Sequence, residues 1–391
     1  MSWIKVKLAD VTEYITDGDH QPAPKSETGI FFVKIKDIQN NKVVFDNALF
    51  VPQQYYDRLP QNRKAVNGDT LYTVVGSYGI PAFVNHDIPF CFERNIALLH
   101  PNGRVVPQYL YYAVKNPAFY EYANNIANGS AQKLIPLSKL ASMEIVVPPL
   151  EIQKKIVVLL SAYDDLIENN QQQIKLLEEA AQRLYKEWFV DLRFPGHETT
   201  PIVDGVPEGW KQQSLYQIAD VVMGQSPKSE YYNQVGEGLP FHQGVGSYGN
   251  RFVSDETYST SFTRIAEAGS ILFSVRAPVG RLNLTKNKVV IGRGLAAINH
   301  RRGAQSYLFY LLKEKFFRDD IIGNGSIFAS ISKEELLNQK FLIPIDSLVG
   351  QFNGIAGGID KKIDILSEQI RLLTEARNRL LPKLMSGEIE V

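Results

Sequence analysis

The sequence has little that could support a disulfide-bonded, secreted or membrane-spanning protein. Cys91 is the only cysteine among 391 residues, so no disulfide can form within the chain. No apolar run is long enough to cross a bilayer. The segment from Met1 to Lys5 leads straight into mixed sequence and lacks the apolar core of a signal peptide. We therefore expect a cytoplasmic protein with no membrane association.

Motifs for metal binding and catalysis are also missing. The six histidines show no ligand spacing, and no P-loop, nucleophile elbow or paired-carboxylate motif occurs. Gly244–Gly249 fits G-x-G-x-x-G, but no apolar helix follows it, which favours a simple turn. Asn116–Phe119 approaches the Asn-Pro-Pro-Phe/Tyr motif of adenine methyltransferases, yet it lacks the second proline and a Gly-rich S-adenosylmethionine loop. We predict no catalytic residue, no metal and no cofactor in this chain.

The formal net charge is zero, which at first argues against a nucleic-acid partner. The charge is unevenly distributed, however, because residues 210–345 hold 16 Lys and Arg against 11 Asp and Glu. The segment from Arg276 to Arg302 contains seven basic residues and no acidic one. Such an excess can attract phosphates, although a solvated basic surface explains it equally well.

The strongest signal is an internal repeat. A constant offset of 196 residues pairs Gly129-Ser130 with Gly325-Ser326 and continues over some sixty positions to Arg183-Leu184 and Arg379-Leu380. Upstream the match is looser, with Arg94-Asn-Ile-Ala resembling Arg293-Gly-Leu-Ala. The chain therefore contains a variable domain and a well-matched tail, each present twice.

Each tail is predicted to be a long helix. Apolar residues recur with heptad spacing and one four-residue stutter, from Ile152 to Trp188 and again from Leu348 to Leu384. Because the two patterns share every step, we expect the helices to pack on each other. The residues expected at this contact are Ile156, Leu159, Ile167, Ile174, Leu177, Leu184, Phe352, Ile355, Ile363, Ile370, Leu373 and Leu380. An antiparallel pair with a pseudo-twofold axis would need only a local linker between the first helix and the second domain.

The variable domains read as α+β, with strands such as Thr70–Val75 and Ser270–Val275 and helices such as Tyr109–Val114 and Tyr307–Leu312. The predicted fold class is thus α+β: two variable domains separated by two long antiparallel coiled-coil helices. The predicted segments are a first domain at 1–149, a helix at 150–190, a linker at 191–209, a second domain at 210–345 and a helix at 346–391.

Two divergent domains, each followed by a matching helix, resemble the specificity subunits of type I restriction-modification systems. The local matches are Gly129–Ile135 with Gly325–Ile331, then Val146–Gln153, then Gln173–Leu177 and Arg377–Leu384. The family usually has Pro-Pro-Leu-x-x-Gln at each helix start, and the second copy at Pro344 departs from it. The resemblance covers essentially the whole chain.

The resemblance implies that each variable domain reads one half of a split double-stranded DNA target, with an unread spacer between the halves. It implies that the helices space the domains and dock two methyltransferase subunits, which carry S-adenosylmethionine. A restriction subunit would add ATP, Mg²⁺ and DNA cleavage. This chain would then have no catalytic activity of its own. Half-sites one helical turn apart, roughly 34 Å, suit readers held apart by long helices.

Exposed Arg, Lys, Gln, Ser and Tyr near Gly-rich loops are the candidate DNA contacts, since Arg and Lys suit guanine edges and Gln suits adenine. They are Ser77, Tyr78, Arg94, Gln132 and Lys133 in the first domain, and Gln243, Arg276, Arg281, Arg293 and Ser326 in the second. Each could equally contact a phosphate. Two alternatives remain open: a self-contained DNA adenine methyltransferase, and a coiled-coil adaptor that does not bind DNA.

Overall fold

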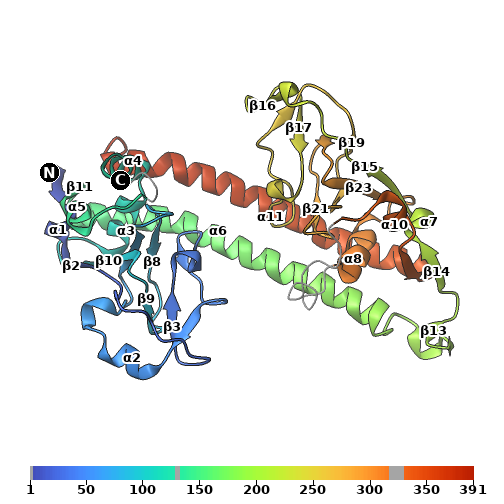
Figure 1. Ribbon diagram of the computed structural model, residues 1–391, viewed down its shortest axis with the longest axis horizontal. Helices are drawn as coiled ribbons and strands as arrows, with labels where there is room; N and C mark the ends of the chain where they lie inside the picture. Colours follow the sequence, from blue (N-terminus) through green and yellow to red (C-terminus); the bar gives the residue numbers. More distant parts are fainter. Residues whose placement is uncertain (1–2, 128–132, 317–329) are drawn as a thin grey trace. The chain divides into compact units, whose positions relative to one another are not determined.

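A computed structural model describes residues 3–127, 133–316 and 330–391 (Figure 1). The chain divides into two compact units. The first contains Met1–Asn170 and Gln369–Val391, and the second contains Gln171–Glu368. Each unit therefore holds one α+β domain together with about half of each long helix. This differs from the predicted segments, in which each helix stands apart, because the helix halves share a hydrophobic core with the domains.

A four-stranded antiparallel sheet forms the centre of the first unit, in the order β2-β10-β7-β8. Its middle strand β10 begins with four fully buried residues, Ile96 to Leu99, as expected for a strand covered on both faces. A parallel pairing of β3 with β9 forms a second small sheet, and β1 pairs with β11. The strands are β1 (Ile4–Lys7), β2 (Thr12–Asp17), β3 (Ile30–Val33), β4 (Ile38–Gln39), β5 (Lys42–Val43), β6 (Leu49–Val51), β7 (Thr70–Thr73), β8 (Pro81–Phe83), β9 (Phe90–Phe92), β10 (Ile96–Pro101) and β11 (Glu144–Val147).

Helices cover this sheet, and the central one, α3, is buried along its whole apolar run from Tyr109 to Val114. Pro107 occupies the first turn of α3, where a missing N–H costs nothing. The helices of this domain are α1 (Leu8–Val11), α2 (Gln53–Arg58), α3 (Pro107–Lys115), α4 (Pro117–Ile126) and α5 (Leu137–Ser142).

The second unit repeats this topology. Its main sheet has the order β15-β23-β20-β21, and β14 pairs with β24 as β1 does with β11. The strands are β12 (Ile202–Val203), β13 (Val206–Pro207), β14 (Lys211–Ser214), β15 (Ala219–Met223), β16 (Tyr232–Asn233), β17 (Leu239–His242), β18 (Tyr258–Ser259), β19 (Ile265–Ala266), β20 (Ile271–Ser274), β21 (Leu282–Leu284), β22 (Val289–Ile291), β23 (Leu295–His300) and β24 (Lys340–Ile343). The helices are α7 (Leu215–Ile218), α8 (Gln305–Phe316) and α10 (Lys333–Leu337).

The segment between the first long helix and the second domain is folded onto the second unit. It contains the β12–β13 hairpin, and Phe194 is only 2% exposed. The Phe194 ring lies 5.3 Å from that of Trp210, and both contact Leu348 at the start of the second long helix. The predicted linker is therefore an ordered part of the core rather than a free connection.

The long helices are α6 (Leu150–Tyr185), extended by one π-helical turn at Lys186–Val190, and α11 (Asp346–Ser386). In the first unit, Ile156 and Leu160 of α6 share a core with Leu381 and Leu384 of α11. In the second unit, Ala181 and Tyr185 near the end of α6 pack with residues near the start of α11, among them Phe352. The beginning of each helix thus contacts the end of the other, so the packed segments run antiparallel.

The buried positions of these helices differ from the predicted seam. Ile355 is 48% exposed, while Ala356 beside it is fully buried. On α11 the inward positions follow Val349, Phe352, Ala356, Ile359, Ile363 and Leu366, which is a regular alternation of three and four. On α6, Leu160 is fully buried whereas the expected Leu159 is only partly so. The structure thus gives Ala356 and Leu160 the most buried positions where the sequence predicted Ile355 and Leu159, and the stutter itself stays a prediction.

The other predicted contact residues are buried to different degrees. Ile156, Phe352 and Ile363 are fully buried, and Ile167 is 8% exposed. The remaining ones are partly buried: Ile174, Leu177, Leu184, Ile370, Leu373 and Leu380.

Candidate nucleic-acid interface

In the first domain, the loop after β7 carries Ser77 and Tyr78. The chain turns back sharply here, since the N–H of Gly79 donates to the carbonyl of Thr73 at 2.8 Å. Gly79 has a φ of +85°, and a Cβ at this position would lie 2.5 Å from the ring of Tyr120. Glycine is therefore required both for the backbone conformation and for the close approach of α4. The turn leaves Ser77 exposed and Tyr78 half-buried.

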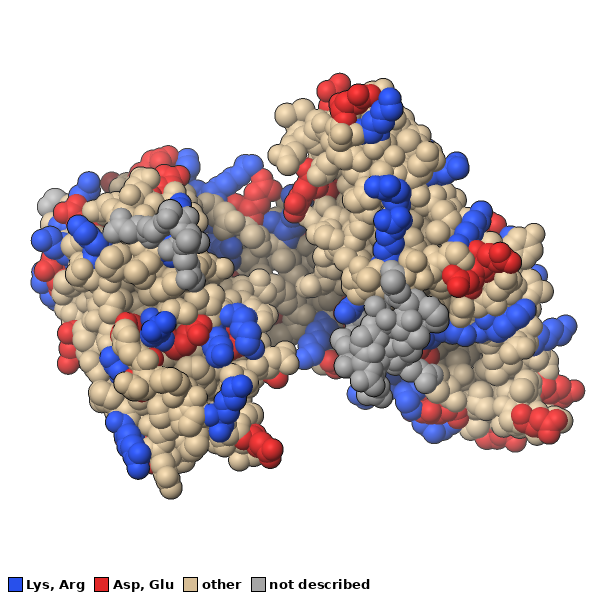
Figure 2. All heavy atoms as spheres, viewed as in Figure 1, with Lys and Arg blue, Asp and Glu red and all other residues tan. Residues whose placement is uncertain are grey.

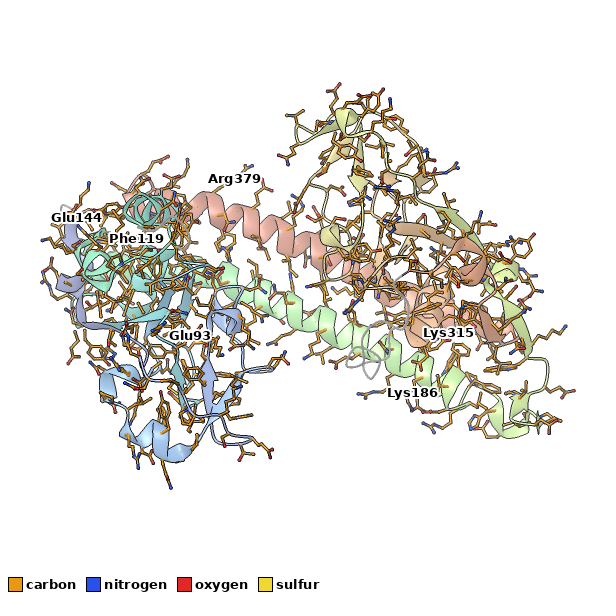
Figure 3. All side chains as sticks on the ribbon, in the orientation of Figure 1. Glu93, Phe119, Glu144, Lys186, Lys315 and Arg379 are labelled. Carbon is orange, nitrogen blue, oxygen red and sulfur yellow. The ribbon has the colours of Figure 1, made fainter. Side chains whose placement is uncertain are left out.

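Main-chain hydrogen bonds gather two further segments at this loop. The N–H of Val74 donates to the carbonyl of Asn95 at 2.9 Å, which brings Arg94 to the same end of the sheet. The N–H of Gly76 donates to the carbonyl of Lys133 at 3.1 Å. The turn that carries Arg94 is also anchored through Glu93, labelled in Figure 3, whose carboxylate accepts from the N–H of Ile35 at 2.8 Å. Ser77, Tyr78, Arg94 and Lys133 thus lie together, although 56 positions separate the first from the last in the sequence.

Two residues of α4 join this group that the sequence did not single out. Tyr120 stacks on Tyr78, with ring centroids 6.1 Å apart and planes 13° apart. Asn124 accepts a hydrogen bond from the hydroxyl of Tyr78 and another from the ammonium of Lys133 at 3.0 Å. Nothing in the local sequence marked Asn124, because only the tertiary fold brings α4 to the β7–β8 loop.

The second domain builds the corresponding loop from Arg276 to Gly280. The N–H of Gly280 donates to the carbonyl of Ser274 at 3.0 Å, and that of Val275 donates to Gly294 at 2.9 Å. Gly294 follows Arg293, so Arg276 and Arg293 lie at the same end of this sheet, and both are exposed. Arg293 therefore occupies the same turn as Arg94 in the first domain.

Gln243 joins the second group through a short network. Its carbonyl accepts from the N–H of Gly294 at 3.1 Å, and its side-chain oxygen accepts from the hydroxyl of Ser226 at 2.7 Å. The same Ser226 oxygen accepts from the N–H of Arg293 at 3.2 Å. Arg281 lies on the opposite side of the loop and is half-buried, with its N–H donating to Ser274.

The Gly244–Gly249 segment forms a 3₁₀ turn at Val245–Ser247, as predicted, and no phosphate-binding helix follows. A buried histidine holds this turn in place. The ring of His242 is fully buried and contacts Ser247 at 2.9 Å and Asp255 at 3.1 Å. Gln132 and Ser326, the other two predicted contacts, lie outside the described residues.

The Asn-Pro-Ala-Phe segment has a structural explanation. Asn116 caps α4, with its side-chain oxygen accepting from the N–H of Ala118. Phe119, labelled in Figure 3, is 5% exposed and packs edge-on against Tyr72 at 5.8 Å. The two residues that suggested a methyltransferase motif therefore serve helix capping and core packing.

The acid-free segment Arg276–Arg302 is not a continuous basic surface. Acidic residues from other parts of the second unit pair with four of its seven cations. These ion pairs are Lys286–Asp364, Lys288–Glu267, Arg301–Asp220 and Arg302–Asp346. On the face shown in Figure 2, Lys and Arg are interspersed with Asp and Glu in both units. Arg276 and Arg293 remain as exposed cations at the β20–β21 loop and the turn beside it.

Within the described ranges, no group of three or more His, Cys, Asp or Glu side chains is arranged to hold a metal ion. Among the same residues, no helix is both long and apolar enough to cross a membrane.

Known proteins with similar sequences identify the family of this chain. The sequence model described as "Type I restriction modification DNA specificity domain" matches residues 2–179 and 207–377, which contain the β7–β8 and β20–β21 loops. The chain belongs to the type I restriction-modification DNA specificity family. Each of the two matches covers one copy of the repeat, from its variable domain into its long helix.

The relatives support this assignment along the whole chain. One relative, from Methanocaldococcus jannaschii, is named as the specificity subunit of the type I restriction enzyme MjaX. It is 30% identical to this chain, and the alignment covers 100% of this chain and 94% of the relative. The HindI specificity subunit of Haemophilus influenzae is 22% identical over 99% of each chain. A crystal structure of the type I restriction-modification S subunit from M. genitalium matches 98% of this chain and 96% of its own, with a TM-score of 0.61 and 16% identity. This last match shows a shared fold.

Proposed function

We propose that this chain is a sequence-specific DNA-binding specificity subunit that reads a bipartite target with an unread spacer. The observation that carries the proposal is the repeated loop geometry. In each domain the loop that follows β7 or β20 meets an arginine-bearing turn, with Arg94 or Arg293 at the matching place. Exposed Arg and Lys side chains on rigid turns suit contacts to base edges and phosphates. Two such sites in one chain fit two half-sites.

The long helices are proposed to set the distance between the half-sites and to dock two methyltransferase subunits. Leu176 of α6 and Leu372 of α11 are equivalent in the 196-residue repeat, and they are 64% and 51% exposed. Exposed leucines at equivalent positions suit two copies of one partner. S-adenosylmethionine would bind the methyltransferase subunits, and a restriction subunit would bring ATP and Mg²⁺. This chain would contribute recognition and no catalytic group.

The experiment is a genome-wide map of methylated adenines in cells that express this chain with its methyltransferase partners. We expect one motif with two specified halves and a fixed gap. The purified chain alone should neither methylate nor cut DNA. Methyl transfer without partners would favour a self-contained methyltransferase. A coiled-coil adaptor would show no DNA binding, whereas a specificity subunit should bind with a steep salt dependence.

A further inference from the structure

The side chain of Asn124 has a fixed orientation. Its Oδ1 lies 3.0 Å from the ammonium of Lys133, and its amide nitrogen could not face that cation because both are donors only. The oxygen must therefore point at Lys133. The hydroxyl of Tyr78 is also in hydrogen-bond contact with this oxygen, so it must be the donor.

These two bonds occupy both lone pairs of the Asn124 oxygen. The ammonium of Lys133 also lies 3.5 Å from the hydroxyl oxygen of Tyr78, which closes the triangle. Among the described residues, none occupies the amide –NH₂ of Asn124 or the third N–H of Lys133, so these two groups are available to a ligand. Both are donors. The cluster formed by Tyr78, Asn124 and Lys133 therefore offers donors and no acceptor from Asn124.

Packing keeps this arrangement in place. The Tyr78 ring is stacked on Tyr120, and the ammonium of Lys133 sits 5.9 Å from the centre of the Tyr78 ring. Asn124 and Lys133 are exposed, and the backbone of Lys133 is hydrogen-bonded to Gly76 at the start of the recognition loop. The donor groups thus face solvent at the candidate interface of the first domain.

We propose that Asn124 is a specificity-determining residue that, together with Lys133, selects guanine at one position of the first half-site. Guanine presents two acceptors, O6 and N7, in the major groove. An asparagine that reads adenine must accept from N6 and donate to N7, and the occupied oxygen of Asn124 excludes the first of these bonds. This inference rests on the proposed function. A phosphate also offers only acceptors, so the test must separate a base from the backbone.

The test measures binding of the full-length chain, with its methyltransferase partners, to its own target. Each guanine of the first half-site is replaced in turn by 7-deazaguanine, which lacks the N7 acceptor. At one position we expect binding to weaken roughly tenfold, the effect of losing one good base contact. The Asn124→Ala variant should no longer respond to this replacement. Asn125→Ala, a change at the next exposed residue of α4, should respond as the unaltered chain does.

A second variant tests the occupied lone pair directly. Tyr78→Phe keeps the stacked ring but removes the donor, so Asn124 regains one acceptor and adenine should become tolerated where guanine was required. The methylation motif would then widen at that single position. The inference is overturned if replacing each guanine of the first half-site by 7-deazaguanine leaves binding unchanged. It is also overturned if Asn124→Ala weakens binding to all sequences alike and only methylphosphonate replacement of a backbone phosphate reproduces that effect. Binding with no sequence preference at either half-site would instead overturn the proposed function itself.

Discussion

Arg251 forms a buried ion pair with Asp360, so a loop of the second recognition domain is joined to the long helix α11. Arg251 is only 4% exposed, and its guanidinium lies 3.8 Å from the centre of the Phe309 ring on α8. A second carboxylate, Glu178 of α6, lies 3.8 Å from the same guanidinium. One arginine therefore holds the loop against three helices.

We expect Arg251→Met to destabilise the protein by about 3 kcal/mol, because the partly buried carboxylate of Asp360 then lacks its cation and the packing of the buried guanidinium on Phe309 is lost. Urea unfolding of the full chain measures the change. The double variant Arg251→Met with Asp360→Asn should recover part of the loss, since of the two carboxylates only Glu178 then lacks its cation. The matched control is Arg301→Met. Arg301 pairs with Asp220 at a largely exposed site, so this change should lower the free energy of unfolding by less than about 1 kcal/mol. Equal losses at both sites would contradict the anchoring role of Arg251.

The residue equivalent to Asp360 in the repeat, Asp164, has different partners in the first unit. It accepts from the hydroxyl of Tyr112 at 2.8 Å, pairs with Arg377 of α11 at 2.5 Å and lies 3.5 Å from the ammonium of Lys115. Burial, with help from the neighbouring Arg377, lowers the pKa of Lys115 to about 8, although Asp164 opposes the shift.

This lowered pKa predicts that stability rises with pH. Between about pH 8 and pH 10, unfolded Lys115 binds a proton that the folded state releases, so the free energy of unfolding increases by at most about 1.4 kcal/mol per unit. From about pH 8.5 the Cys91 thiol opposes part of the rise, because burial raises its pKa to about 12, and above pH 10 buried tyrosines such as Tyr109 oppose it as well. Urea unfolding from pH 7.5 to 9.5 should show the increase. Lys115→Met should abolish it, and Lys139→Met, at an exposed position, should not.

Arg276→Ala and Arg293→Ala should weaken binding through the second half-site only. A lost base contact should cost about 1–3 kcal/mol and relax one position of the motif, whereas a lost phosphate contact should weaken all sequences alike. Titration of targets altered in one half-site at a time distinguishes these outcomes. Arg302→Ala is the control, because Arg302 follows the far end of β23 and pairs with Asp346. A change in the first half-site would show that the domains have been assigned to the wrong halves.

Changing the length of the helices should change the gap in the motif. We would insert seven residues after Asn170 and seven after Leu366, which keeps the regular alternation of buried positions on α6 and α11. Each insertion lengthens its helix by roughly 10 Å, about the rise of three base pairs. The methylation motif of this variant should keep both half-sites and gain a longer gap. An unchanged gap with full activity would mean that the helices do not set the spacing.

The sequence by itself determined the repeat, and with it the larger part of the fold. Matches at one offset of 196 residues, such as Asp164 with Asp360, are a local property that can be read without coordinates. They predicted two long helices and two domains of one topology. Strand segments such as Thr70–Thr73 and Ile271–Ser274 also follow from local patterns, because a buried strand needs a short apolar run bounded by turns.

Only the tertiary structure decided which side chains meet. The pairing of Arg251 with Asp360 joins residues 109 positions apart, and the contact of Asn124 with Tyr78 joins residues 46 positions apart. No local pattern encodes such contacts, since they depend on how the elements pack. For the same reason the sequence placed Ile355 in the helix contact when Ala356 occupies it, and it could not show that acidic residues outside Arg276–Arg302 neutralise four of its cations. Periodicity defines a face of a helix to within one residue, and packing against the partner selects the residue that is buried.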